Sequence, residues 1–366
     1  MWRTASVLVG VVLTFTLFGV VMLLSTSSVH GLQQFGDANY FVKRQLVALC
    51  VALVLGFVVS RIDYRLWRTW AIPLAGVTIF LLVLALLPGI GVTVKGSSRW
   101  IRFGPLTFQP SELGKFSAIV LMAWYMARSQ RGVKEFLRGL FIPLMLLGVI
   151  ALLILAAPDF GTTLLVGVVG MLIMFAGGTR VGYLTVTAVL GGVTFLILVM
   201  HDTVRMRRVI AFRNPDKYAQ DEAFQLLSAI YAFVIGGAGG VGLGQSIQKR
   251  FYLPESHTDF IFAIIGEELG LAASLSVVLL FGVLFGCGML IALRTGDLFG
   301  KLLALGITLM ITLQAAFNMA VVTGLVPTKG LPLPFISYGG SSLVVTLIMV
   351  GVLINIALTG EEDEDM

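Results

Sequence analysis

Ten long runs of apolar residues, separated by short polar connections, constrain this chain more than any other feature of its sequence. Only 12% of the residues are charged and 58% are hydrophobic, whereas an average soluble protein carries about a quarter charged residues. A water-soluble core cannot bury such an excess, but a lipid bilayer can, and a helix that spans one needs about 20 mostly apolar residues. The sequence therefore predicts an all-α, polytopic integral membrane protein with about ten transmembrane helices, at 6–24, 44–60, 70–88, 112–128, 141–157, 161–178, 182–200, 262–293, 299–323 and 341–359.

The predicted helices form a single transmembrane helical domain over residues 1–360. The first run, 6–24, is expected to stay as a helix rather than to be removed as a signal peptide, because the polar stretch after it lacks a convincing cleavage site. The run 262–293 exceeds one span, so its first turns are expected to project above the bilayer or to tilt strongly. The longest loop, 201–261, lies between spans seven and eight, and the acidic tail 361–366 is predicted to be disordered.

The distribution of lysine and arginine between the loops predicts the orientation of the chain. Cytoplasmic loops of membrane proteins carry the excess of these residues. With both termini inside and the long loop set aside, eleven lie inside and six outside. Both termini are therefore predicted to be cytoplasmic, so the more elaborate loops 89–111, 201–261 and 324–340 face outward. The inner set is Arg3, Arg61, Arg65, Arg68, Arg128, Arg131, Lys134, Arg138, Arg180, Arg294 and Lys301, and the outer set is Lys43, Arg44, Lys95, Arg99, Arg102 and Lys329.

The charge and the cysteine and histidine content argue against several classes of protein. The net charge is +6, but the basic residues lie between apolar runs. The sequence lacks the basic stripe with interleaved aromatic residues that would indicate nucleic-acid binding. Cys50 and Cys287 lie inside apolar runs, which argues against a structural disulfide or a metal cluster. His30, His201 and His257 lack the spacing of metal ligands, so a zinc enzyme is disfavoured.

Two ionisable residues, Glu112 and Lys115, lie at the start of the fourth predicted span. Because they are three residues apart on a helix, they share one face and can form an ion pair. Charges at membrane depth are costly and usually face a cavity, so we expect this pair to line a site. A structural ion pair that joins two helices is the alternative. Asp159, just before the sixth span, is equally well explained as a helix cap.

The long loop contains three segments with different predicted roles. Residues 205–208 form a basic cluster near the membrane, which can either bind lipid phosphates or anchor the chain at the interface. Residues 225–231 suit an interfacial helix. The glycine-rich stretch 236–244 matches the pattern G-x-G-x-x-G, but no strand precedes it, so a dinucleotide site is disfavoured. Flexible turns, or a close approach of the backbone to a ligand, remain open for this stretch.

The end of the same loop carries Glu255, His257 and Asp259 within five residues, directly before an apolar helix. A carboxylate at this boundary between water and lipid is partly desolvated, which makes it a better general base, so Asp259 is the candidate catalytic residue. A helix cap at Asp259 or its neighbour is the alternative. A cap alone does not require the two glutamates that follow one to two turns later, Glu267 and Glu268.

Prolines interrupt the last outer loop. Pro327, Pro332 and Pro334 exclude a continuous helix over 324–340. Irregular backbone near membrane depth is tolerated where it lines a cavity. Lys329 would bring a cation to that cavity.

Five stretches of this sequence resemble the SEDS family, whose members include FtsW, RodA and SpoVE. The two longest are LPESHTDFIFAIIGEELG at 253–270 and GLVPTKGLPLPFISYGGSS at 324–342. PDFGTT at 158–163, KGSSRWI at 95–101 and QPSELGK at 109–115 support them. The layout of ten spans agrees with the family from end to end.

The resemblance implies a peptidoglycan glycosyltransferase of the bacterial cytoplasmic membrane. Such an enzyme polymerises lipid II, a disaccharide-pentapeptide on undecaprenyl pyrophosphate, at the outer face of that membrane. The family's catalytic aspartate corresponds to Asp259, and a pair regarded as lining its central cavity corresponds to Glu112 and Lys115. Also implied are a divalent cation (Mg²⁺ or Mn²⁺) with Asp259 as a ligand, and a partner, a class B penicillin-binding protein with one membrane span. Further side chains expected to hold the departing phosphates or to line the cavity are Arg99, Arg102, Arg205, Arg208, His257, Lys329 and Ser337.

Two other functions are kept as alternatives. A lipid II flippase or transporter would use Glu112 and Lys115 along a translocation path. A scaffold surrounded by membrane lipids would only recruit partners and would depend on no single polar residue. The polar motifs gather on the outer side, which favours catalysis. A role in cell division or elongation is expected. Lys329 and the stretch 245–249 resemble the division type, FtsW, more than the elongation type, RodA, and so favour division.

Overall fold

The protein is a bundle of long helices in the computed structural model. Twelve α-helices and three β-strands are assigned within the described residues. The acidic tail predicted to be disordered, 361–366, lies outside those residues, as do Lys95 and Pro254 of two sequence motifs. The described residues are 1–94, 97–104, 106–250, 253 and 255–360.

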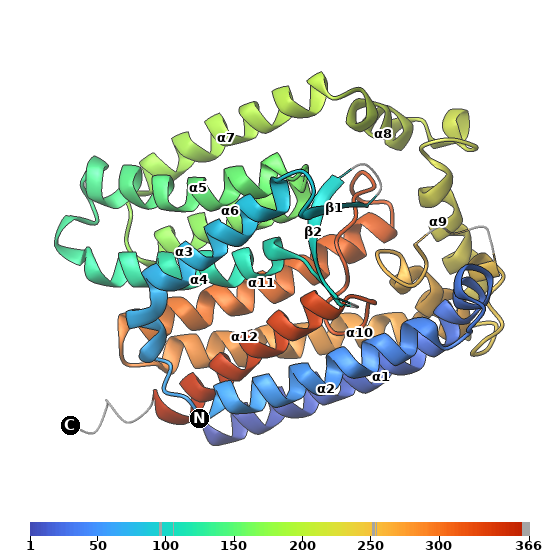
Figure 1. The fold of residues 1–366 in the computed structure, drawn as a ribbon, viewed down its shortest axis with the longest axis horizontal. Helices are drawn as coiled ribbons and strands as arrows, with labels where there is room; N and C mark the ends of the chain where they lie inside the picture. The colour runs from blue at the N-terminus through green and yellow to red at the C-terminus, as the bar shows by residue number, and fades with distance from the viewer. Residues whose placement is uncertain (95–96, 105, 251–252, 254, 361–366) are drawn as a thin grey trace.

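Ten of the helices correspond one to one to the ten predicted apolar runs. Figure 1 shows them side by side, with successive helices pointing in opposite directions and both termini at the same end of the bundle. This arrangement places the connections predicted to be outside together at the other end. The ten helices are α1 (Trp2–Phe35), α2 (Tyr40–Ser60), α3 (Leu66–Leu86), α4 (Pro110–Arg128), α5 (Ile142–Ala156), α6 (Phe160–Ala176), α7 (Val181–His201), α10 (Ile261–Arg294), α11 (Leu298–Val322) and α12 (Gly340–Thr359).

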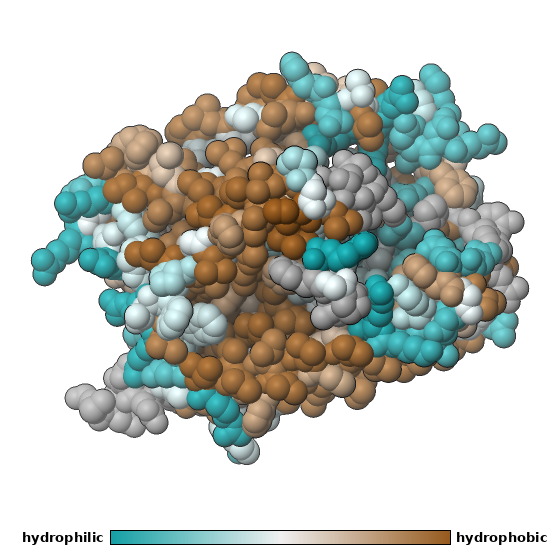
Figure 2. Space-filling view, viewed as in Figure 1, coloured by the Kyte–Doolittle hydropathy of each residue, from teal (hydrophilic) through white to brown (hydrophobic). Residues whose placement is uncertain are grey.

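Eight helical segments in the described chain are long and apolar enough to cross a membrane by length and composition. With 17 residues, α6 is shorter than these, and α4 is not among them. Figure 2 shows apolar side chains over the long helices and hydrophilic ones towards the two ends of the bundle. The all-α class and the multi-pass membrane character are confirmed, whereas ten remains the predicted number of spans.

A small antiparallel sheet, which the sequence reasoning did not predict, forms in the loop between α3 and α4. Its strands are β1 (Gly91–Val94), β2 (Ser97–Phe103) and β3 (Leu106–Phe108), in the order β1-β2-β3. The pairing of β1 with β2 slips by one residue opposite Arg99. A slip of this kind is a β-bulge, which re-aims the side chain at the bulge.

The long outer loop folds into short helices. The stretch 225–231, predicted as an interfacial helix, belongs to α9, which buries Leu226, Ala229 and Ala232 and packs along α10. The loop is therefore part of the folded bundle. Its elements are α8 (Thr203–Arg213), the 3₁₀ turns η3 (Pro215–Tyr218) and η4 (Gln248–Arg250), and α9 (Phe224–Gly236). A different loop, between α4 and α5, contains the 3₁₀ turn η1 (Gln130–Gly132) and the π-helical turn η2 (Leu137–Phe141).

Helix α10 is broken at Gly270, whose φ of 76° and ψ of −168° lie outside the helical region. Around the break, the carbonyls of Glu267 and Glu268 accept hydrogen bonds from the backbone N–H groups of Val241 and Gly242, both at 2.9 Å. A side chain at Gly270 would collide with the backbone that faces it. The glycine-rich stretch therefore does approach another backbone closely, but that backbone is α10 and not a ligand.

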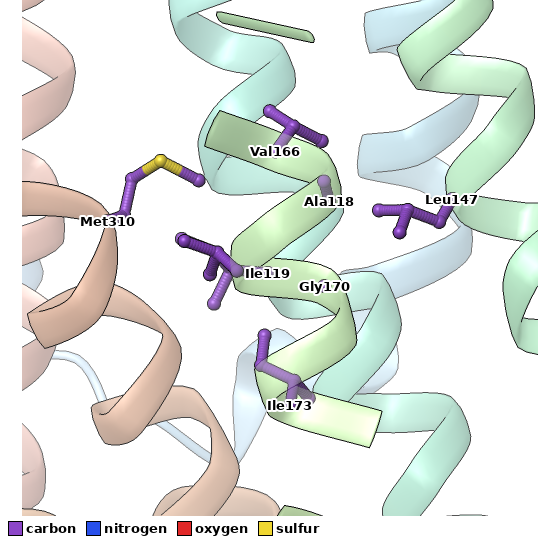
Figure 3. Close-up of a pocket in the computed structure, with 8 residues that line it drawn as sticks. Ala118, Ile119, Leu147, Val166, Gly170, Ile173 and Met310 are labelled. Atoms are coloured by element: carbon purple, nitrogen blue, oxygen red, sulfur yellow. The ribbon is translucent and has the colours of Figure 1, made fainter. Parts of the chain in front are cut away.

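Helix α4 lies at the centre of the bundle and α7 at its edge. Fifteen of the 19 residues of α4 are buried, whereas Leu184 is the one buried residue found in α7. Figure 3 shows how α4, α5, α6 and α11 meet through apolar side chains, among them Ile119, Leu147 and Met310. The gap between these side chains has no room for a water molecule. The bundle interior at this level is thus closed and apolar.

Candidate functional site

Asp259 lies in a tight turn directly before α10, at the end of the bundle opposite to the termini. Its side chain is half-buried. Glu255, which opens the turn, has a φ of 60°, and its carboxylate accepts a hydrogen bond from Thr258 Oγ1 at 2.8 Å. Such a left-handed backbone conformation is strained for a side chain other than glycine. The N-cap of α10 is Phe260, without a side-chain cap, so Asp259 is not the cap of this helix.

The backbone around Asp259 is fixed by the proline-rich loop between α11 and α12. Asn318 Nδ2 donates to the carbonyl oxygens of Asp259 (2.7 Å) and Leu331 (2.6 Å), and so joins the two segments. Ser337 Oγ donates to the carbonyl oxygen of Thr258 at 2.6 Å. Ser337, predicted to line the cavity, therefore positions the turn. Asn318 also positions the turn. Sequence reasoning did not identify it, because a single asparagine in an apolar helix gives no signal of its own.

Glycine at position 330 makes room for the catalytic candidate. A β-carbon on Gly330 would collide with the carboxylate of Asp259. The carboxylate therefore lies directly against this glycine, and the preceding residue is Lys329. Asp259 and Lys329 are 70 positions apart in the sequence, but the structure places the carboxylate of Asp259 against the residue that follows Lys329 in the chain.

Lys329 belongs to a cluster of cations, which we call the Lys329 cluster: Lys329, Arg99, Arg205 and Arg208. Burial lowers the pKa of the Lys329 ammonium from 10.5 to about 8. The carboxylate of Asp159 opposes this shift, and the three arginines reinforce it. The protein thus concentrates positive charge where it is partly shielded from water, an arrangement that favours binding of an anion.

Phe160, the first residue of α6, packs against two members of this cluster. The guanidinium carbon of Arg205 lies 3.2 Å from the centroid of the Phe160 ring, and Lys329 Nζ lies 5.6 Å from it. Arg205 also pairs with Asp202 at 3.1 Å. Cation–π contacts of this kind hold basic side chains in place without neutralising them.

Asp159 and Arg99 form the base of the Lys329 cluster. Asp159 caps α6 by accepting a hydrogen bond from the N–H group of Thr162 at 3.3 Å, which confirms the predicted cap. Arg99 Nε donates to the carbonyl oxygen of Ala157 at 2.9 Å, and Arg99 Nη1 lies 3.9 Å from Asp159 Oδ1. The bulge in β2 thus directs Arg99 towards the start of α6.

Arg102, predicted with the other cations, lies elsewhere. It is not among the charges that act on Lys329, and it lines a separate pocket together with Arg44. His257 is buried, and its ring lies beside those of Phe41 (4.7 Å between centroids) and Tyr338 (5.9 Å). His257 therefore lies on the side of the Asp259 turn that faces α2.

The predicted ion pair between Glu112 and Lys115 is present, with Lys115 Nζ 2.6 Å from Glu112 Oε2. Both side chains are almost completely buried. Lys115 Nζ also donates to Gln314 Oε1 at 2.8 Å, and Gln314 Nε2 donates to the carbonyl oxygen of Pro332 at 2.8 Å. The pair thus connects α4 to α11 and to the loop that carries Lys329.

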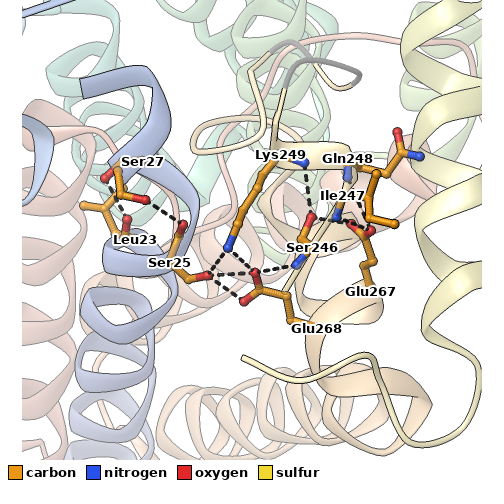
Figure 4. A network of polar contacts seen from close by, with 10 residues as sticks. Leu23, Ser25, Ser27, Ser246, Ile247, Gln248, Lys249, Glu267 and Glu268 are labelled. Carbon is orange, nitrogen blue, oxygen red and sulfur yellow. Dashed lines mark hydrogen bonds and ion pairs between the residues drawn. The ribbon is translucent and has the colours of Figure 1, made fainter. Parts of the chain in front are cut away.

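A second buried network, shown in Figure 4, joins α1, α10 and the outer loop. Lys249 Nζ donates to Glu268 Oε1 at 2.7 Å and to Ser25 Oγ at 3.0 Å. Glu267 accepts hydrogen bonds from the N–H group of Ile247 (2.8 Å) and from Ser246 Oγ. The two glutamates that a cap did not explain therefore fasten the outer loop to the bundle. Lys249 lies in the stretch 245–249 that resembles the division type, but sequence reasoning missed its contacts with Glu268 and Ser25, because no local pattern indicates them.

Asp259 is the predicted ligand of a divalent cation. Among the described residues, no three histidine, cysteine, aspartate or glutamate side chains converge as a metal site. Mg²⁺, however, is commonly bound by one or two carboxylates together with substrate phosphates. Asp259 as a single carboxylate fits that second mode, and not a site built by the protein alone.

A half-buried carboxylate and a cluster of cations at one end of a helical bundle with an apolar surface form the polar end of a multi-pass membrane protein. The chain belongs to the FtsW/RodA/SpoVE family of cell cycle proteins, whose sequence profile matches residues 5–362. The predicted family is thereby confirmed.

Two relatives cover nearly the whole chain. The protein is 45% identical over 352 residues to a Trichlorobacter lovleyi protein named probable peptidoglycan glycosyltransferase FtsW, covering 96% of this chain and 92% of the relative. It is 40% identical over 361 residues to stage V sporulation protein E of Bacillus subtilis, covering 97% and 98%.

Two solved structures share the fold. One chain, from a structure described as "Structural coordination of polymerization and crosslinking by a peptidoglycan synthase complex", matches with a TM-score of 0.78 at 27% identity, and 96% of each chain is covered. The rod shape determining protein RodA of Thermus thermophilus matches with a TM-score of 0.72 at 26% identity, again with 96% of each chain covered.

Proposed function

We propose that this protein is a peptidoglycan glycosyltransferase that polymerises lipid II into glycan strands, in cell division or elongation. The observation that carries the proposal is the contact of the half-buried Asp259 carboxylate with Gly330, the residue that follows Lys329 of the cation cluster in the chain. The names of the relatives support the reaction class. Lys329 and the name FtsW, carried by a relative with 45% identity, support the division branch.

The reaction joins two lipid-linked sugars. A hydroxyl oxygen of one sugar forms a bond to the anomeric carbon of the other, and the bond from that carbon to the phosphate oxygen breaks. The electron pair leaves with the pyrophosphate, and the hydroxyl proton passes to the carboxylate of Asp259 as general base. The leaving pyrophosphate gains negative charge, which Lys329, Arg205, Arg99 and Arg208 stabilise because they are already in place.

The proposal includes the setting of the enzyme. The site opens on the outer face of the bacterial cytoplasmic membrane, and both termini are cytoplasmic, in line with the excess of inner lysines and arginines and with the common end of the two termini (Figure 1). The partner is a class B penicillin-binding protein, whose single span packs on the apolar surface of the bundle and whose outer domain touches an outer loop. Crosslinks to the inner loops alone, 61–69 or 129–139, would contradict this partner arrangement.

The divalent cation remains part of the proposal as an ion that Asp259 shares with the substrate phosphates. When bound, it would supply further positive charge to the pyrophosphate. The acid–base role of Asp259 and the anion binding by the Lys329 cluster are derived without it.

The decisive experiment incubates purified lipid II with the purified protein and with its Asp259→Ala variant. Glycan strands are expected with the wild type and not with the variant, as measured by gel electrophoresis of labelled product. A parallel assay follows movement of lipid II across vesicles that contain the protein. Transport of lipid II without polymer, unaffected by Asp259→Ala, would identify a flippase and overturn the proposal.

A further inference from the structure

The outer end of the bundle contains a second basic site, separate from the Lys329 cluster, which we call the Arg44 pocket. It has a volume of about 450 Å³, within the range of about 300–1,000 Å³ that is usual for ligand sites. The end of α1 and the start of α2 supply one wall, and strands β2 and β3 with the turn between them supply the other. The lining residues are Phe35, Tyr40, Arg44, Arg102, Gly104 and Thr107.

The Arg44 pocket is both cationic and aromatic. Among the described residues, no carboxylate forms an ion pair with Arg44 or Arg102. The guanidinium carbon of Arg44 lies 4.6 Å from the centroid of the Tyr40 ring, which stacks on Phe35 at 3.8 Å. Arginine binds phosphate through two parallel hydrogen bonds, so two arginines without acidic partners favour a phosphate-bearing ligand.

The Arg44 pocket is directly connected to the Asp259 turn. Arg44 lies near enough to the Tyr338 hydroxyl to lower its pKa, against the larger effect of burial, which raises it. The N–H group of Tyr338 donates to the carbonyl oxygen of His257 at 3.0 Å, two residues before Asp259. One helical position along α2, Gln45 accepts a hydrogen bond from the N–H group of Gly339 at 3.2 Å. The first turns of α2 therefore have two roles. Gln45 binds the loop beside the Asp259 turn, and Tyr40 and Arg44 line the pocket.

Strand β2 supplies one arginine to each basic site. Arg99 points to the start of α6 and joins the Lys329 cluster, whereas Arg102 lines the Arg44 pocket. The Asp259 turn is in contact with Gly330 on one side and, through His257, with Tyr338 on the other. Two separate groups of cations are thus connected to the turn that carries the candidate base, Lys329 through Gly330 and Arg44 through Tyr338.

The chemistry of joining two lipid-linked sugars requires two such sites. Both reactants carry a pyrophosphate, but only the donor's pyrophosphate leaves, while the acceptor's stays attached to its own sugar. The leaving group gains charge and belongs with the four cations of the Lys329 cluster. We propose that the Arg44 pocket binds the intact pyrophosphate of the acceptor, so that the acceptor's hydroxyl is presented to Asp259. This inference rests on the proposed function and assigns the two substrates to different sides of the turn.

The test uses Arg44→Gln and Arg102→Gln, with Lys43→Gln as the matched control. Lys43 is the neighbour of Arg44, but its side chain is 68% exposed and pairs with Asp37 at 2.7 Å, away from the pocket lining. Lys329→Gln serves as the variant of the opposite site. Thermal unfolding of each purified variant shows that it is folded before its kinetics are compared.

The kinetic measurement separates donor from acceptor. Lipid II whose attacking hydroxyl is capped by a further sugar reacts only as donor, so uncapped lipid II can be varied as acceptor against it. Arg44→Gln and Arg102→Gln are expected to raise KM for the acceptor about tenfold or more, the loss expected for one hydrogen bond to a charged group, and to leave KM for the capped donor nearly unchanged. Lys329→Gln is expected to do the reverse. Unchanged kinetics, or an effect on the donor instead, would overturn the assignment.

Two further measurements distinguish the ligand and the failure modes. The assay is repeated in bilayers of phosphatidylcholine with and without phosphatidylglycerol; an effect of Arg44→Gln that appears only with phosphatidylglycerol would make the pocket a phospholipid site. Binding of capped lipid II to Asp259→Asn protein is expected to show two sites, and the additional Arg44→Gln change is expected to leave one. Two remaining sites would sink the inference. A wild type that binds two molecules but forms no polymer would refute the proposed function alone.

Discussion

The turn at 255–260 and the first turns of α10 are neighbours in sequence, yet their carboxylates differ in burial and in hydrogen-bond partners. Asp259 is half-buried at the end of the bundle, with its carboxylate against a glycine. Glu267 and Glu268 are 0% and 1% exposed, and their oxygens are occupied by donors from the outer loop and α1. Access, and not residue type, therefore separates a carboxylate that can meet a substrate from one that holds the fold.

The two regions also differ in what their cations do. Lys249 is buried against Glu268, so its charge is neutralised within the protein. Lys329 forms no such ion pair within the described residues; the acidic group acting on it is the more distant Asp159, and three arginines also act on it. A buried ion pair joins two segments of the protein, whereas an excess of positive charge favours binding of an external anion.

The largest effect is expected at the buried pair. Lys249→Met leaves the carboxylate of Glu268 buried without its cation, which should lower the free energy of unfolding by about 3–5 kcal/mol. Thermal unfolding in detergent measures this loss, with the exposed Lys43→Met as control. The double change Lys249→Met and Glu268→Gln should recover part of it. If the single variant is as stable as the wild type, the network does not fasten the loop.

At the Asp259 turn, the same kind of isosteric change should act on chemistry alone. Asp259→Asn keeps the size of the side chain and breaks no cap, but removes the group that accepts the proton. Polymerisation of lipid II is expected to fall by about a hundredfold or more, with an unchanged melting temperature. A variant that polymerises at nearly the wild-type rate would remove Asp259 from the mechanism.

Glu267→Gln applies the matching change to the other region. The amide would keep one oxygen for the N–H group of Ile247, but its nitrogen would face Ser246 Oγ, whose hydroxyl donates to the native carboxylate and would lose that acceptor. The expected cost is about 1–3 kcal/mol of unfolding free energy, with the activity of the folded fraction preserved. Activity per folded molecule, from a polymerisation assay corrected for the folded fraction, decides the case. Loss of activity without loss of stability would show that Glu267 takes part in the reaction and not only in the fold.

The smallest effect is a change in pH dependence at Lys329. Its pKa of about 8 means that the free enzyme loses this charge as the pH rises through that value, so kcat/KM for lipid II should decline above pH 8. Lys329→Arg stays protonated and should lack this decline, while differing little from the wild type at pH 7. Identical pH profiles for the two proteins would show that the Lys329 charge does not control binding.

Several parts of the site were open to sequence reasoning. Asp259 and Lys329 lie in unusual polar stretches at the ends of apolar helices, and Glu112 and Lys115 have a spacing that predicts their ion pair. The cap at Asp159 follows from its position before a helix. Each of these signals is local, because it depends on residues within one or two helical turns.

Other parts were not accessible in this way. Arg99 and Arg102 are three residues apart, and their sequence gave no reason to assign them to different sites, yet a bulge and the packing of the sheet separate them. The glycine-rich stretch gave no indication that its partner was α10. Asn318 is one amide in an apolar helix until the proline-rich loop is folded beside it.

The sequence by itself determined that the chain is a membrane bundle, how its helices alternate and which loops carry the polar motifs. The reason is that hydrophobic length and the placement of charge act on each segment separately, whatever its neighbours. The tertiary structure decided which of the polar side chains meet. Ser25 reaches Glu268 across 243 positions, and Asn318 reaches Asp259 across 59. Such contacts depend on the packing of whole helices against one another, and no local pattern in the chain records that packing.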